Sequence, residues 1–112
     1  MSPVEVVQRQ VEAYNAHDLD AFAATYADTI QMVRLPATEP AIKNKAELRE
    51  FYGTNRFMAP NLRAEVLNRM VLGNKVIDHE RIMGLANSPF ECVVIYEVEN
   101  DLIQRVWSIW PQ

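Results

Sequence analysis

The chain has 112 residues, of which 49% are hydrophobic and 23% are charged, and its formal net charge is −4. This length predicts a single domain over residues 1–112, with enough apolar residues for a real core. Lys and Arg form no cluster, which argues against nucleic-acid binding. The single cysteine, Cys92, excludes an internal disulfide and fits a reducing compartment.

The first half of the chain is predicted to be mainly helical. Apolar side chains recur at helical spacing in the first predicted helix: Val4, Val7, Val11 and Tyr14. Ser2-Pro3 is a plausible helix start, and Asp18 is a good N-cap for a second helix. That second helix is expected to place on one face Leu19, Phe22, Ala23 and Tyr26. A short strand over 30–35, a loop over 36–44 and a third helix from Lys45 to about Arg56 follow.

The second half changes to the period of strands. Strands are predicted over 62–72, 75–85, 90–98 and 102–110, with turns at Gly73-Asn74, 86–89 and 99–101. Helices followed by a four-strand meander predict an α+β fold, with the helices against one face of an antiparallel sheet.

The last two strands are apolar on both faces. Val106, Ser108 and Trp110 alternate with Trp107 and Ile109. Helices can cover only one face, so the other would be an exposed apolar patch. We therefore expect a homodimer through a sheet face made of Val93, Ile95, Trp107 and Ile109. The alternative is a cover formed by a loop or by the C-terminus.

Three stretches of the sequence resemble a known family. They are VVQRQVEAYNAHDLDAFAATYAD (6–28), KAELREFY (45–52) and YEVENDLIQRVWSIW (96–110). They resemble the SnoaL-like and ketosteroid-isomerase-like branch of the nuclear transport factor 2-like superfamily. The resemblance implies a cone-shaped, cystatin-like fold, in which a curved antiparallel sheet wraps N-terminal helices around a mostly apolar pocket. Members are often homodimers, and their activities are too varied for the fold to give the function.

The standard catalytic residues of two branches of this superfamily are missing. Matched to ketosteroid isomerases, Arg34 stands at the position of the base, Gln10 at that of the oxyanion tyrosine and Val94 at that of the oxyanion aspartate. Matched to limonene-epoxide hydrolases, Arg81 agrees, but Met83 and Ser108 stand where aspartates are expected. The last strand also lacks the carboxylate that SnoaL-type polyketide cyclases use.

The resemblance suggests that Arg81 faces the pocket. Alternation along the strand would then bring His79 and Met83 to the pocket, and turn Asp78 and Glu80 away from it. The remaining expected pocket lining is Tyr14, Tyr26, Met32, Arg34, Tyr52, Val94, Tyr96, Val106, Ser108 and Trp110. Arginines and a histidine would favour an acidic ligand.

His79 is the candidate acid/base and Arg81 the candidate substrate-orienting residue. The alternatives are a histidine that is simply hydrogen-bonded in the sheet, and an ion pair of Arg81 with Glu97 or Glu65. Cys92 lacks an evident base, and two histidines give too few ligands for a metal site.

We therefore expect a pocket for a small organic molecule, with an acidic one favoured, in a protein of the cytoplasm. The activity expected is that of an isomerase, lyase or hydrolase without cofactor. The alternative is a non-catalytic binding domain or a structural dimerisation domain. We expect no metal, no nucleic-acid partner and no membrane span.

Overall fold

Three helices and a five-stranded sheet make up the computed structural model, which describes residues 1–111. The elements in chain order are α1 (Pro3–Asn15), α2 (Leu19–Ala23), β1 (Tyr26–Arg34), α3 (Lys45–Asn55), β2 (Arg63–Leu72), β3 (Lys75–Met83), β4 (Phe90–Glu99) and β5 (Leu102–Ile109). The predicted α+β class and order are confirmed. β1 begins at Tyr26, whereas helical spacing places this residue on α2. Tyr26 is fully buried in the strand, so an apolar pattern alone could not decide between the two.

The helices begin where the sequence supplies caps. The Ser2 hydroxyl accepts a hydrogen bond from the Glu5 amide, and the Glu5 carboxylate accepts one from the Ser2 amide, which closes a capping box on α1. Asp18 caps α2 as predicted, by accepting from the Ala21 amide at 3.0 Å. Asn44 does the same for α3. These caps fix where α1 and α3 enter the fold, and so where they face the sheet.

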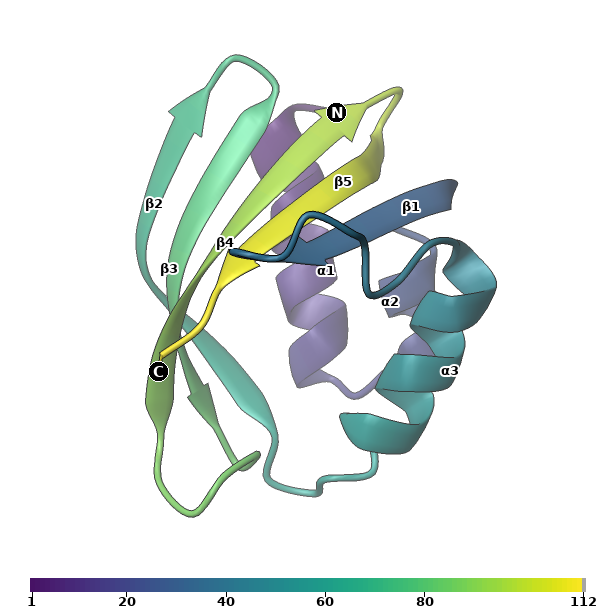
Figure 1. The fold of residues 1–112 in the computed structure, drawn as a ribbon. Helices are drawn as coiled ribbons and strands as arrows, with labels where there is room; N and C mark the ends of the chain where they lie inside the picture. Colours follow the sequence, from purple (N-terminus) through teal and green to yellow (C-terminus); the bar gives the residue numbers. More distant parts are fainter. Residues whose placement is uncertain (112) are drawn as a thin grey trace.

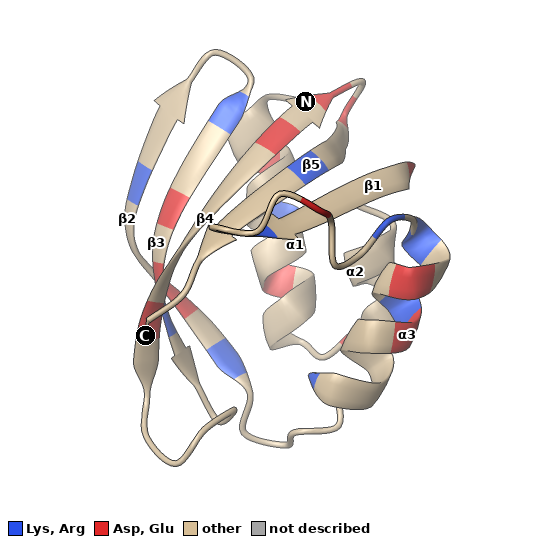
Figure 2. Ribbon diagram, in the orientation of Figure 1, with Lys and Arg blue, Asp and Glu red and all other residues tan. Residues whose placement is uncertain are grey.

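The strands lie in the order β1-β5-β4-β3-β2. β2, β3, β4 and β5 form the predicted antiparallel meander, and β1 adds to its edge in parallel with β5. Figure 1 shows the sheet curving around α1, with all three helices on its inner side. Figure 2 shows acidic and basic residues interspersed over the strands and α3.

A β-bulge in β2 changes which of its side chains face inward. Val66 pairs with Glu80 and Asn68 pairs with His79, so Leu67 is an extra residue in the ladder. Beyond the bulge, Arg69 therefore lies opposite Asp78. Without the bulge, Asn68 would occupy that register and no cation would face Asp78.

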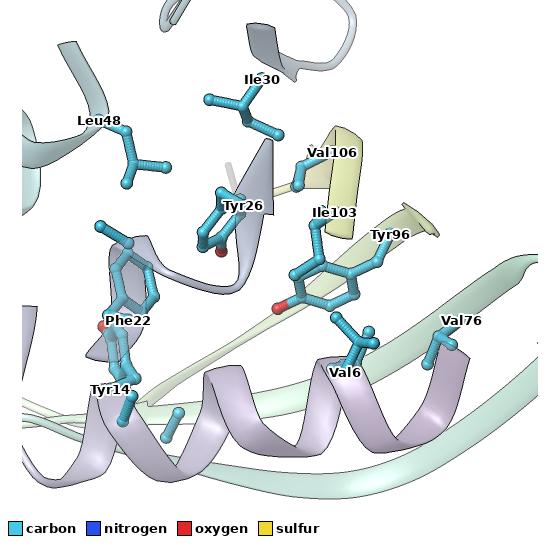
Figure 3. Close-up of a cluster of buried hydrophobic side chains, with 14 of the residues drawn as sticks. Val6, Tyr14, Phe22, Tyr26, Ile30, Leu48, Val76, Tyr96, Ile103 and Val106 are labelled. Atoms are coloured by element: carbon cyan, nitrogen blue, oxygen red, sulfur yellow. The ribbon is translucent and has the colours of Figure 1, made fainter. Parts of the chain in front are cut away.

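Aromatic side chains dominate the core beside the helices. Phe22 packs against Tyr26 at 5.0 Å between ring centroids, against Tyr52 at 4.7 Å and against Phe57 at 5.2 Å. Figure 3 shows Tyr26 of β1 and Tyr96 of β4 projecting into the interior above α1. Tyrosines place hydroxyl groups inside this otherwise apolar region, where each needs a hydrogen-bond partner.

The opposite face of the sheet carries partly exposed apolar side chains. Val93, Ile95 and Trp107 are half-buried, and Ile109 is 47% exposed. These are the residues of the predicted dimer interface, which stays a prediction. Among the described residues, no helix is both long enough and apolar enough to span a membrane.

Candidate functional site

A cavity of about 90 Å³ lies between the helices and the inner face of the sheet. Its lining comes from α1, β1, α3 and the other four strands: Gln10, Val11, Tyr14, Tyr26, Met32, Tyr52, Arg56, Ala64, Glu80, Ile82, Cys92, Val94, Tyr96, Val106, Ser108 and Trp110. Most of this surface is apolar, with a few polar groups directed into it, as in small-molecule sites generally.

Glu80 supplies the carboxyl group of this lining. Burial alternates along β3, so that Val76, Asp78, Glu80 and Ile82 are buried. Glu80 is 5% exposed, and the Tyr96 hydroxyl donates a hydrogen bond to its Oε2 atom at 3.3 Å. A carboxyl group is thus held inside an apolar cavity by a neighbouring strand.

Burial raises the pKa of Glu80 to about 7, and the negative charge of Asp78 adds to this effect. The hydrogen bond from Tyr96 and the positive charge of Arg69 lower the pKa by smaller amounts. A carboxyl group with this pKa is present in both protonation states near neutral pH. It can therefore take a proton from a bound molecule or give one to it.

Asp78 lies two residues before Glu80 on the same face and is fully buried. Arg69 binds it at two points, with Nε at 2.7 Å from Oδ1 and Nη2 at 2.9 Å from Oδ2. Gln8 on α1 accepts a further hydrogen bond from Arg69. This two-point pairing gives the Asp78 charge a partner inside the fold. It also places a fixed negative charge beside Glu80.

The prediction that His79 and Arg81 face the pocket is wrong. Both side chains lie on the outer face of the sheet, and neither lines the cavity. His79 Nε2 is 2.5 Å from Glu91 Oε1, and Arg81 Nη1 donates to Glu65 Oε1 at 3.0 Å. The alternatives stated for them, a hydrogen-bonded histidine and an ion pair with Glu65, describe what the structure shows.

The expected pocket lining is found in large part. Tyr14, Tyr26, Met32, Tyr52, Val94, Tyr96, Val106, Ser108 and Trp110 all line the cavity. Met83 and Arg34 do not. Met83 shares the outer face of β3 with His79 and Arg81. Arg34 is exposed at the end of β1, where its guanidinium stacks on the Trp110 ring at 4.5 Å.

Sequence reasoning missed Glu80 because the two faces of β3 are alike in composition. The inner face carries two apolar and two ionisable residues and the outer face two apolar and three ionisable residues, so alternation alone cannot tell which face is inside. The match of Arg81 to an arginine of limonene-epoxide hydrolases then favoured the wrong face. The signal that decides the face is the register with β4, where Glu80 pairs with Cys92 and Asp78 with Val94.

The other polar groups of the cavity remain neutral or unpaired. Burial raises the pKa of Tyr52 to about 12 and that of Cys92 to about 12, so both stay protonated at neutral pH. Gln10 is 6% exposed, and its Oε1 atom has no hydrogen-bond partner among residues 1–111. Arg56 lines the cavity from the C-terminal end of α3.

Among the described residues, no three His, Cys, Asp or Glu side chains gather as metal ligands do.

Comparison with known families gives a match over most of the chain. Residues 7–106 match the SnoaL-like domain. The chain belongs to the SnoaL-like domain family. This confirms the resemblance noted from the sequence. A comparison with curated proteins gives no match.

Solved structures share the fold of this SnoaL-like domain. A cystatin-fold protein from Novosphingobium aromaticivorans superposes with a TM-score of 0.88 at 24% identity, covering 97% of this chain and 98% of that one. The Delta 5-3-ketosteroid isomerase from Mycobacterium sp. gives 0.83 at 21% identity, covering 99% and 95%. An LEH-like epoxide hydrolase of M. tuberculosis gives 0.79 at 13% identity, covering 97% and 82%. At these identities, the likeness establishes a common fold and leaves the activity open.

Proposed function

We propose that this SnoaL-like domain is a cofactor-independent enzyme that moves a proton on a small organic molecule, with Glu80 as the general acid and base. The observation that carries the proposal is the carboxyl group in the cavity wall, whose pKa is raised to about 7. Strongly shifted titratable groups in a cavity are typical of catalytic sites. Isomerisation and elimination both begin with removal of a proton by such a group.

The cavity supports a small substrate. Its volume of about 90 Å³ is below the roughly 150 Å³ of an engineered protein cavity that binds benzene. This space is smaller than a fused-ring substrate such as a steroid would need. The tyrosines of the lining are protonated at neutral pH, so the Tyr52 and Tyr14 hydroxyls can donate hydrogen bonds to an oxygen that gains negative charge.

Proton exchange in D₂O tests Glu80 even while the substrate is unidentified. The purified protein is incubated with a panel of small ketones and keto acids, and loss of the α-hydrogen signal is followed by NMR. A positioned general base accelerates proton abstraction by about 10²–10⁴-fold. We expect acceleration with at least one compound, loss of it in Glu80→Gln, and no loss in His79→Gln, whose side chain lies outside the cavity.

Two results would overturn the proposal. One is the absence of accelerated exchange across the panel, and the other is equal acceleration by Glu80→Gln and the unmodified protein. Binding of a panel compound without exchange would instead favour the alternative of a non-catalytic binding domain.

A further inference from the structure

Arg56 is held against three aromatic rings, of which those of Tyr52 and Trp110 line the cavity. Its guanidinium carbon lies 4.9 Å from the centroid of the Phe51 ring, 5.7 Å from that of Trp110 and 5.9 Å from that of Tyr52. Stacking on rings fixes a guanidinium through its faces and leaves the N–H groups of its edge available. The side chain is therefore oriented without using its hydrogen-bond donors.

No carboxylate of the described residues forms an ion pair with Arg56, although it is half-buried. Three other arginines are paired: Arg69 with Asp78, Arg49 with Asp20 and Arg81 with Glu65. The remaining arginines are exposed to solvent, unlike Arg56. A half-buried cation that faces a cavity and lacks an internal partner is suited to an anionic ligand. Bidentate hydrogen bonding makes a carboxylate the best geometric match.

Arg56 and Glu80 act on the same cavity from different elements. Glu80 is on β3, and Arg56 follows α3. Both line the cavity together with Tyr14, Tyr52 and Cys92, and the charges of both act on these three groups. A ligand with its anionic group at Arg56 would thus extend toward the acid/base carboxyl.

From these contacts, we infer that the ligand is a small carboxylic acid, bound as its anion by Arg56. The inference deepens the proposed function and rests on it only for the reaction at Glu80. The volume of about 90 Å³ limits the acid to a few carbon atoms beyond the carboxylate.

The test compares crotonate with crotonamide, which has a similar shape and no charge. Affinities are measured by ligand-observed NMR titration at pH 7.5 for the unmodified protein, Arg56→Gln, Arg56→Lys and Arg34→Gln. Arg34 is the matched control, because it stacks on the same Trp110 ring but does not line the cavity. Thermal unfolding of each variant verifies that it is folded.

We expect crotonate to bind at least ten times more tightly than crotonamide. Arg56→Gln should remove this preference, Arg56→Lys should keep part of it, and Arg34→Gln should keep all of it. Equal binding of the two compounds, failure of both to bind, or a preference that survives Arg56→Gln would overturn the inference. Binding is measured without turnover, so this result is separate from the D₂O exchange that tests Glu80.

Discussion

Arg69 binds Asp78 through two hydrogen bonds, of 2.7 and 2.9 Å, on the inner side of the sheet. The Asp78 side chain is fully buried and that of Arg69 is 19% exposed. The bulge at Leu67 creates this pairing by placing Arg69 in register with Asp78. The ion pair is therefore both a structural contact and part of the electrostatic environment of Glu80.

Removing one partner of this pair should be costly. We expect Asp78→Ala to lower the free energy of unfolding by about 3–5 kcal/mol, because it leaves the Arg69 charge without its partner. The control is Glu65→Ala, which removes the half-exposed pair with Arg81 and should cost at most about 1 kcal/mol. Urea denaturation measures both free energies of unfolding. Similar losses of stability in the two variants would contradict the assignment of Arg69 and Asp78 as a buried ion pair.

Glu80 should make stability depend on pH in a defined direction. Its pKa is raised from 4.5 in the unfolded chain to about 7 in the folded protein, so folding favours the protonated carboxyl. This contribution to stability is fully present below pH 4.5 and is lost as the pH rises through 7. The total change is about 3 kcal/mol.

Glu80→Gln removes this titration. The free energy of unfolding of the variant should therefore rise relative to that of the unmodified protein by about 3 kcal/mol between pH 4.5 and pH 8. Denaturation curves across this range measure the difference. A difference that stays constant with pH would show that the carboxyl is not shifted.

His79 and Arg81 should be dispensable for binding in the cavity. Their side chains pair with Glu91 and Glu65 on the outer face. We expect His79→Ala and Arg81→Ala to change the affinity for crotonate less than twofold, in the same titration used for Arg56→Gln. A tenfold loss of crotonate affinity in either variant would show that the mutated residue contributes to binding in the cavity.

The outer face of the sheet should form a homodimer. Stable interfaces bury about 800 Å² on each partner, and the half-exposed apolar residues of β4 and β5 are suited to this. We expect the unmodified protein to have the mass of a dimer in light scattering, and Ile109→Lys to shift it to a monomer. The control Met58→Lys replaces a 76% exposed side chain between α3 and β2 and should stay dimeric. A monomeric unmodified protein would contradict the prediction.

Gly84 should be far less tolerant of substitution than Gly73. Both have positive φ angles, of 80° and 59°, and alanine in this conformation costs about 1–2 kcal/mol. A Cβ atom at Gly84 would also collide with the Asn61 carbonyl group, whereas the space at Gly73 is open. Overpacking of this kind adds about 1–3 kcal/mol. Chemical denaturation of the two alanine variants should show this difference, and equal losses would count against it.

The sequence predicts much of the fold because local signals mark its boundaries. Ser2, Asp18 and Asn44 cap the helices, and the Gly73-Asn74 turn separates β2 from β3. The start of β1 at Tyr26 was missed, because a buried tyrosine fits both a helix face and a strand.

The candidate site was predicted only in its apolar part. Residues such as Tyr96 and Val106 belong to strands that are apolar on both faces, and the family resemblance placed them in the lining. Glu80 depends on register instead, since a shift of one residue turns every side chain of β3 to the other face. The bulge at Leu67, which brings Arg69 to Asp78, leaves no distinct mark in the sequence.

The measurement that tests the central claim most directly is the pKa of Glu80 in the folded protein. Protein labelled with ¹³C in the glutamate side chains is titrated by NMR, and the Glu80 carboxyl signal is assigned by its absence from Glu80→Gln. We predict a midpoint near pH 7, because burial and Asp78 both disfavour the charged form. A midpoint near 4.5, the ordinary value for glutamate, would contradict its role as acid and base at neutral pH.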